Sequence, residues 1–327
     1  MPSTTSIIED LPPDISCAET DPPYALASNA VSTISINTYS VGMPPSRCSF
    51  TRASGTCNEP LVFKIPYFQR DPEPPARPPS RLPPPGNIFL SLKLGKRVGR
   101  GRSGVVYEAT IDPTASSSEV NSLIAPPLVV KISRRGHSTD IEHESFYYEE
   151  MECLQGVVVP RFYGLFEGET PPGSYFDPTG EGERREPGRD EIDTPDTEEE
   201  EHVPAAVSGA VSILVLEQVG GRLPLGEDLP PNTLHEILDV YTHLATLGID
   251  HVDIRYANMR YAPQCPPGWP SLISPYTGLP YRWRLIDFEK AKKTNRRIDA
   301  FEVYHQQWVS RILDNLPFGD VVEPWDF

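Results

Sequence analysis

The strongest constraint on the fold comes from residues 88–111, where apolar and polar side chains alternate on both sides of a glycine-rich stretch. This segment reads IFLSLKLGKRVGRGRSGVVYEATI. Alternation with a period of two is typical of strands that bury one face, and glycine allows the chain to reverse in a tight turn. The segment therefore predicts two strands joined by a turn, and so a fold that contains an antiparallel β-sheet.

Other short apolar runs predict further strands around a helix. The runs at 128–133 (LVVKIS), 157–166 (VVVPRFYGLF) and 210–221 (AVSILVLEQVGG) have strand character. Between the first two, residues 140–156 carry apolar side chains at helical spacing and end in Gly156, a residue suited to the end of a helix. We expect a helix that lies between two of these strands along the chain.

The clearest helix lies at 233–248 (TLHEILDVYTHLATLG), because its apolar residues recur every three or four positions. Thr233 and Glu236 fit a capping box at its start, and Gly248 fits the position just past its end. The remaining expected elements are two short strands, at 259–261 and 283–288, and a last helix at 297–316.

Two long segments lack such periodicity. Residues 1–86 are rich in Pro, Ser and Thr, and residues 167–205 are rich in Pro, Gly and acidic residues. We expect both to be disordered, because they offer too few apolar side chains to form a core. Two PxxP matches within residues 72–78 could alternatively present a polyproline II ligand to a partner. The acidic insert could alternatively bind a basic partner or act as a self-inhibiting flap.

Charge and cysteine content narrow the class of protein. The net charge of −17 argues against nucleic acid or an anionic membrane as the main partner, since both would repel the chain. Five scattered cysteines without a CxxC pair indicate neither a disulfide framework nor a zinc site. The chain shows no apolar leader and no run long enough to span a bilayer. We expect a soluble, intracellular protein, cytoplasmic or nuclear.

The glycine-rich turn has the composition of a phosphate-binding loop. Gly99, Gly101 and Gly104 fit the pattern GxGxxGxV, which ends at Val106. Glycine lets backbone amides approach phosphate oxygens and permits the positive φ of a tight turn. Dinucleotide-binding folds share the glycine pattern but continue into a helix, whereas VVYEAT here predicts a strand.

A lysine in the next strand needs a partner of opposite charge. Lys131 lies in the apolar run LVVKIS, and a buried ammonium requires a phosphate or a carboxylate unless its head reaches water. Among the acidic residues of the following helix, Glu144 shares a face with Tyr148 and Met151, so we prefer it as the partner. Glu150 is the second choice.

Three polar residues further along the chain fit a magnesium-phosphate site. Asp253 and Asn258 follow the clearest helix in the loop HVDIRYAN, and Asp287 ends the strand WRLIDF. Carboxylate and amide oxygens are ligands that Mg²⁺ takes when it also binds phosphates. An Asp that is free of metal can orient a hydroxyl and accept its proton, although a loop Asp is often only a turn residue.

The order of these motifs along the chain, from the glycine-rich turn to HxDxxxxN and IDF, resembles the signature of the protein kinase superfamily. The resemblance covers about residues 90–287, and LQGVVVPRFYG is similar to fungal kinase-like domain proteins. It implies an α+β, bilobal, protein-kinase-like fold with an antiparallel β N-lobe, a reduced and mainly helical C-lobe, and long disordered segments. The domains would be a disordered arm (1–86), an N-lobe with the acidic insert 167–205 (87–220) and a C-lobe with the catalytic loop (221–327).

The resemblance also implies roles for individual residues. The cofactors would be ATP and Mg²⁺, with transfer of the γ-phosphoryl group to a protein Ser/Thr or small-molecule hydroxyl. Asp253 would be the base, Lys131 would bind the α and β phosphates, and Arg255 would lie near the γ phosphate. The residues implied in nucleotide binding are Gly99, Gly101, Gly104, Val106, Lys131, Glu144, Glu217 and Val219, and those implied in metal binding are Asn258 and Asp287.

The chain departs from the kinase pattern in ways that bear on function. Val252 replaces the Arg of HRD, and Glu289 replaces the Gly of DFG. Only 40 residues follow Asp287, so the C-lobe is expected to be short. We expect an active phosphotransferase, because every residue that would handle ATP and metal is present. The alternative is a pseudokinase scaffold that binds nucleotide and protein partners without transfer.

Overall fold

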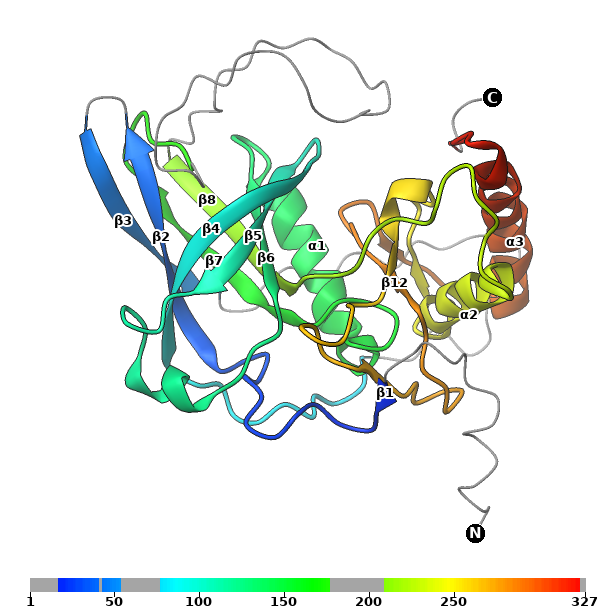
Figure 1. Cartoon of the computed structure of the whole chain (residues 1–327), viewed down its shortest axis with the longest axis horizontal. Coiled ribbons are helices and arrows are strands. Elements are labelled where there is room, and N and C mark those ends of the chain that lie inside the picture. Colours follow the sequence, from blue (N-terminus) through cyan, green and yellow to red (C-terminus); the bar gives the residue numbers. More distant parts are fainter. Residues whose placement is uncertain (1–16, 41–42, 54–76, 177–208, 324–327) are drawn as a thin grey trace.

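A closed barrel of seven β-strands forms one side of the protein (Figure 1). The computed structural model describes residues 17–40, 43–53, 77–176 and 209–323. In order around the barrel the strands are β2 (Val31–Ser40), β3 (Met43–Arg52), β7 (Phe162–Thr170), β8 (Gly209–Glu217), β6 (Leu128–Ser133), β5 (Gly104–Ile111) and β4 (Ile88–Arg100).

The barrel closes because β2 and β3 bridge two edges of a five-stranded sheet. Strands β4, β5, β6, β8 and β7 pair antiparallel in that order. Strand β2 then pairs parallel with β4, and β3 pairs antiparallel with both β2 and β7. Ile34 and Ile36 alternate with polar residues along β2 and are fully buried among apolar side chains of the barrel.

Helix α1 (Ser138–Glu150) packs on the outside of the barrel against β7 and β8. Its buried side chains include Ile141, Tyr147 and Tyr148, which belong to a second apolar cluster rather than to the barrel interior. That cluster continues into the region on the other side of the molecule. Helix α1 therefore connects the barrel to the rest of the fold.

The region beyond α1 is built on two helices that pack against each other, α2 (Thr233–Thr246) and α3 (Ile298–Asn315) (Figure 1). Short strand pairs lie between them and the barrel: β1 (Cys17–Ala18) with β11 (Ser271–Leu272), β9 (Ile249–Asp250) with β13 (Lys292–Lys293), and β10 (Met259–Tyr261) with β12 (Trp283–Leu285). The 3₁₀ helices are η1 (Ser118–Ser122), η2 (Glu152–Leu154), η3 (Tyr256–Asn258) and η4 (Leu316–Phe318).

This architecture overturns the expected fold class. The described residues form a closed seven-stranded barrel with three α-helices, so the expectation of an α+β, bilobal fold with a mainly helical C-lobe is wrong. The physical reason lies in the first 86 residues, which we expected to be a disordered arm. Strands β2 and β3 come from that arm, and they close a sheet that would otherwise be open.

Of the two predicted ends of helix α2, the C-terminal one is confirmed and the N-terminal one is wrong. Gly248 has a φ of 69° just past α2, as expected for a C-terminal glycine. The capping box is wrong: Asn232 is the N-cap residue and makes no side-chain capping bond. Thr233 donates its hydroxyl to the carbonyl of Pro230, and Glu236 pairs with Arg282 at 2.5 Å.

Two expected segments fall mostly outside the described residues. Of the PxxP matches at 72–78, only residues 77 and 78 are described. The acidic insert, expected at 167–205, is described only up to residue 176. Its first four residues, 167–170, belong to strand β7. Over the described ranges, no helix is long and apolar enough to cross a membrane.

Candidate active site

A lysine held between two carboxylates marks the candidate site. The Nζ atom of Lys131, on β6, lies 2.6 Å from Oε2 of Glu144 on α1 and 2.7 Å from Oδ1 of Asp287. Glu150, the second choice for this partner, pairs instead with Lys293 at 2.7 Å. The contact expected between Lys131 and Glu144 therefore forms, and it joins a barrel strand, the outer helix and the segment after β12.

Burial and charge act against each other in this triad. Burial alone lowers the pKa of Lys131, but the charges of Glu144 and Asp287 outweigh burial and raise it. Burial raises the pKa of Glu144 to about 7, although Lys131 opposes the shift. Burial also acts to raise the pKa of Asp287, but Lys131 outweighs it and lowers the pKa. One ammonium thus serves two carboxylates, and the triad can accept a further cation.

The loop after α2 brings Asp253 and Asn258 together. The amide nitrogen of Asn258 donates to the carbonyl of Asp253 at 3.0 Å and to its Oδ2 atom at 3.2 Å. Arg255 donates to the same Oδ2 atom at 2.5 Å. The side chain of Asp253 is 2 % exposed, so the orientation of its carboxylate is set by these donors.

Backbone contacts place this loop beside Asp287. His251 donates from Nε2 to the carbonyl of Ile286 at 2.9 Å, and the amide of Ile286 donates to the carbonyl of Asn258 at 3.2 Å. Val252 and Asp287 have φ values of 64° and 67°, a left-handed conformation that is costly for a β-branched residue. Strain of about 1–3 kcal/mol per residue is held here by the surrounding contacts.

The donor set fits a magnesium ion bound together with phosphates. Asn258 uses its amide nitrogen on Asp253, and its Oδ1 atom has no hydrogen bond to a described residue. Asp287 uses one carboxylate oxygen on Lys131 and has a second. Two protein oxygens suffice for Mg²⁺ when phosphates and water complete its octahedral shell. No group of three or more His, Cys, Asp or Glu side chains in the described parts of the chain could hold a metal ion alone.

The glycine-rich turn lies over this site, but its glycines act differently from the expectation. Gly99, Gly101 and Gly104 all lack positive φ, so the turn does not need them for backbone conformation. A Cβ atom on Gly104 would lie 2.9 Å from the carbonyl oxygen of Ile132 and 3.1 Å from Cγ of Lys131. Gly104 is therefore required for the close approach of β5 to β6.

Side chains tie the same turn to the segment that follows Asp287. Ser103 donates its hydroxyl to the carboxylate of Glu289, and Arg102 lies 3.5 Å from the same carboxylate. Val106 faces Lys131 directly across the β5–β6 pair. The expected phosphate loop and the expected metal ligand Asp287 thus lie at one place.

The two residues expected near the nucleotide base have different surroundings. The side chain of Glu217 is buried in an ion pair with Arg161 at 2.7 Å, and its backbone amide donates to the carbonyl of Arg161. Val219 forms no backbone hydrogen bond with another described residue. Gln218, between them, donates its amide to the carbonyl of Pro127. Val219 is therefore the residue of this segment whose backbone can bind a ligand.

Sequence reasoning assigned no role in the site to Lys290 or Glu289, and it named Glu289 only as a departure from the kinase pattern. Lys290 lies 3.2 Å from Oδ1 of Asp253, and Glu289 binds the glycine-rich turn. Both follow Asp287 within three residues in the string IDFEK, so their position beside an expected metal ligand was the available signal.

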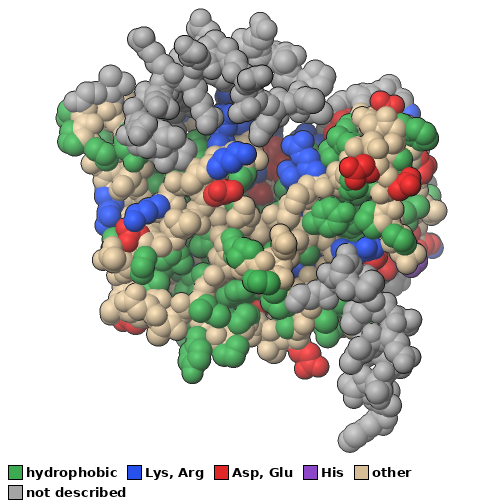
Figure 2. Space-filling view, viewed as in Figure 1, with side chains coloured by type: hydrophobic (Ala, Val, Ile, Leu, Met, Phe, Trp, Pro, Cys, Tyr) green, Lys and Arg blue, Asp and Glu red, His purple; other side chains and the backbone are tan. Residues whose placement is uncertain are grey.

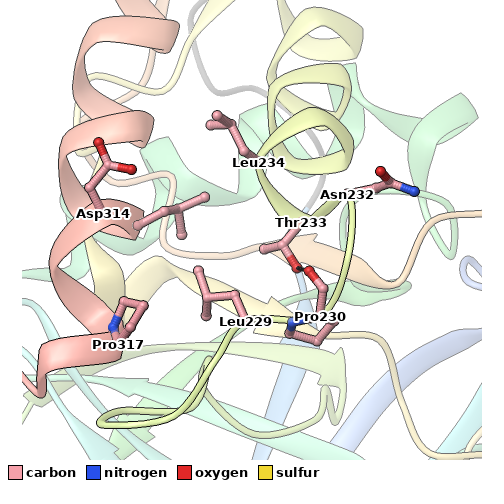
Figure 3. A pocket seen from close by; sticks show the side chains of 8 residues that line it. Leu229, Pro230, Asn232, Thr233, Leu234, Asp314 and Pro317 are labelled. Atoms are coloured by element: carbon pink, nitrogen blue, oxygen red, sulfur yellow. Dashed lines mark hydrogen bonds between the residues drawn. The ribbon is translucent and has the colours of Figure 1, made fainter.

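Surface shape agrees with a site between the barrel and the helices. Figure 2 shows a hollow between these two parts, with acidic side chains at its base and basic side chains on both rims. A second hollow, of about 340 Å³, lies between the start of α2 and the end of α3 (Figure 3). Its walls are mainly Leu and Pro with one carboxylate, Asp314, so it lacks the charges needed to bind phosphates.

Comparisons with known proteins do not assign the chain to a family. No protein-family model matches the chain, and no curated protein matches it. Together with the closed barrel and its three described α-helices, this overturns the expectation that the chain is a member of the protein kinase superfamily or of its fungal kinase-like branch.

Proposed function

We propose that the chain is an ATP-dependent phosphotransferase, which transfers the γ-phosphoryl group of Mg-ATP to a hydroxyl of a protein or a small molecule. The observation that carries the proposal is the ammonium of Lys131 between Glu144 and Asp287. Burying three ionisable groups is costly unless each is paired, and here two carboxyl groups share one ammonium. Mg²⁺ and phosphates would balance this triad, since they bring both signs of charge.

The residues around Asp253 are arranged to position a hydroxyl. A carboxylate offers about four acceptor positions, and Arg255, Lys290 and Asn258 take three of those on Asp253. An acceptor hydroxyl would take the remaining position, which aims its oxygen at the phosphate. Arg255 and Lys290 would then lie where negative charge collects on the transferred group.

The proposed reaction is a single displacement at phosphorus. The acceptor oxygen forms a bond to the γ-phosphorus while the bond from that phosphorus to the β–γ bridging oxygen breaks. ADP leaves with the bonding electrons, and the hydroxyl proton passes to Asp253 and then to solvent. Asn258 and Asp287 would hold Mg²⁺, which neutralises phosphate charge when bound. Lys131 would bind the phosphates that remain on ADP.

One observation favours a second function, nucleotide binding without transfer. Two cations, Arg255 and Lys290, already engage the carboxylate of Asp253 and would compete with an acceptor hydroxyl for it. A module of this kind would bind Mg-ATP with the same triad and present the bound state to a partner. Turnover of ATP labelled in its γ-phosphate, measured with and without added acceptor proteins or small alcohols, separates the two functions.

A calorimetric titration of the full chain with ATP, once with Mg²⁺ and once with chelator, tests the proposal. We expect binding that depends on Mg²⁺ and that is lost in Lys131→Met. The matched control is Lys293→Met, because Lys293 forms a similar, largely buried pair with Glu150 at 2.7 Å, outside the triad. Absence of binding in both buffers, or equal loss in both variants, contradicts the proposal.

A further inference from the structure

Two arginines that form no ion pair with the described carboxylates lie close to the proposed transfer site. Arg222 follows the segment that leaves β8, and Arg260 lies in the middle of β10. Their backbones pair as an antiparallel bridge, and the guanidinium of Arg222 lies over the ring of Tyr256, 5.9 Å from its centre. The two residues are thus held together by the fold, although they are 38 positions apart in the sequence.

Backbone contacts beside the bridge hold the two segments together. The amide of Gly220 donates to the carbonyl of Tyr261 at 2.8 Å, and the amide of Tyr261 donates to the carbonyl of Gly221 at 3.0 Å. A Cβ atom on Gly220 would lie 2.8 Å from the carbonyl oxygen of Ala262, so glycine is needed for this close approach. The pair of arginines is therefore a preformed feature.

The charge on this pair is not balanced by the described residues. Neither guanidinium forms an ion pair with a described carboxylate, and the Nε atom of Arg260 is buried without a hydrogen-bond partner. Burial and the nearby charge of Arg222 lower the pKa of Arg260 to about 10. The proximity of a second cation thus adds to the cost of burying the first.

Other buried arginines of the described chain have acceptors for their terminal nitrogens, although the Nε atom of Arg284 is, like that of Arg260, buried without a partner. Arg161 binds Glu217 at 2.7 Å, and Arg282 binds Glu236 at 2.5 Å. Arg284, which faces Arg260 across the β10–β12 pair, donates to the carbonyls of Gly156 and Val157. A buried donor without an acceptor is costly, so a missing acceptor is the natural complement of Arg260.

The arginine pair lies close in the sequence to a residue of the proposed transfer site. Arg260 follows Asn258 by two residues, which corresponds to about 7 Å along an extended chain. Met259, between them, is buried in the apolar cluster, so Arg260 faces away from that core. One ligand, or two adjacent ligands, would span the distance between the arginine pair and the metal ligand Asn258.

We infer that Arg222 and Arg260 form a binding site for an oxyanion, a phosphate or carboxylate group of a ligand that lies beside the transfer site. Guanidinium groups bind such anions through paired N–H donors, and two of them provide more donors than a lysine would. The inference rests on the proposed function only for the source of the anion. That source is either the nucleotide or an anionic acceptor, such as a phosphorylated or carboxylated alcohol.

Calorimetry with inorganic phosphate as the probe tests the site without any nucleotide. We expect the full chain to bind phosphate about 10-fold more tightly than Arg260→Gln, and more tightly again than the double variant Arg222→Gln, Arg260→Gln. Arg260→Lys keeps the charge and should restore part of the affinity. The matched control is Arg135→Gln, which removes an exposed guanidinium that forms no ion pair with the described residues.

A second arm identifies the source of the anion. Phosphate that still binds when a non-hydrolysable Mg-ATP analogue is saturating, with unchanged nucleotide affinity in the variants, assigns the site to the acceptor. Weaker nucleotide binding in the variants assigns it to the nucleotide. Thermal unfolding shows whether each variant is folded. If Arg260→Gln is not folded, Arg222→Gln replaces it in the phosphate titration, because Arg222 is at an exposed position.

The outcomes separate this inference from the proposed function. Phosphate binding that depends on the arginines, in a chain that does not bind ATP, would retain the oxyanion site and remove the phosphotransferase. Equal phosphate affinity in the wild-type chain, the double variant and Arg135→Gln, with unchanged nucleotide affinity, would overturn the inference.

Discussion

The interior of the barrel and the layer between the barrel and the helices are both buried, but they are built from different chemistry. The barrel interior is filled by apolar side chains such as Ile34, Phe50 and Phe166. The layer between the two parts buries charges, among them Lys131 and Glu144. Apolar burial stabilises the fold without specifying chemistry, whereas buried charges cost free energy and are retained where they bind something. The comparison is the reason that the proposed function is assigned to the second region.

The largest expected effect is on phosphoryl transfer and comes from the charged layer. Asp253→Asn should lower the transfer rate by about 10²–10⁴-fold, because the amide cannot accept the hydroxyl proton. The affinity for Mg-ATP should change little, since Asp253 is not proposed to bind the nucleotide. Rapid-quench assays with labelled ATP measure the rate, and calorimetry measures the affinity. Full transfer activity in this variant would remove Asp253 from the mechanism.

A substitution in the barrel interior should lower the free energy of unfolding. Phe50 is fully buried there, so Phe50→Ala should lower the free energy of unfolding by about 3–5 kcal/mol. Phe318, which is 80 % exposed, provides the control, and Phe318→Ala should change that free energy by less than about 0.5 kcal/mol. Urea unfolding of both variants measures the difference. Similar values for the two would mean that Phe50 is not a core residue.

Buried histidines should make the helical region sensitive to acid. Burial, with the nearby charges of His251 and Arg296, lowers the pKa of His305 from 6.5 to about 3. The unfolded chain therefore binds the proton more readily than the folded one. The stability due to neutral His305 is full above pH 6.5 and is lost as the pH falls from 6.5 towards 3, by up to a few kcal/mol.

His305→Leu tests this pH dependence, because neither ring nitrogen of His305 has a hydrogen bond and leucine is of similar size. Unfolding curves measured from pH 7 to pH 4 should show a smaller loss of stability in His305→Leu than in the wild-type chain. His235→Gln alters a histidine whose side chain is 82 % exposed and should leave the loss unchanged. Parallel curves for wild type and His305→Leu would contradict the prediction.

The smallest expected effect concerns the contact between the glycine-rich turn and Glu289. Ser103→Ala removes the hydroxyl that binds this carboxylate, so the turn should open more readily and release ATP several-fold faster. Stopped-flow displacement with a fluorescent nucleotide measures the release rate. Ser122→Ala, which removes a hydroxyl bonded within η1, is the control. An unchanged release rate in Ser103→Ala would show that the contact does not limit opening.

Much of the local structure followed from the sequence. The two strands around the glycine-rich turn, the strand with Lys131 and the helices α2 and α3 lie where the periodicity predicted them. Periodicity works here because each element buries a face of its own. Strand β2 also alternates, in VSTISINTYS, but its Ser and Thr content led us to assign it to a disordered arm. Strand β3 has only two buried side chains, Cys48 and Phe50, so its sequence carries little strand signal.

The candidate site could be predicted in part. The choice of Glu144 over Glu150 followed from the face shared with Tyr148, and the structure shows the contact with Lys131. The arginine pair could not be predicted, because Arg222 and Arg260 meet only when the segment after β8 crosses β10. Order along the chain also led us to a kinase-like fold, since motif order does not record which strands close a sheet.

The sequence by itself determined the local elements and the residue types of the site, because side-chain periodicity and backbone preferences act over a few residues. Only the tertiary structure decided that the sheet closes into a barrel and that the charges gather beside it. Strand β2 pairs with β4 and β3 pairs with β7 across long stretches of chain. Hydrogen bonds between such distant strands depend on where the whole chain packs, and no local pattern specifies them.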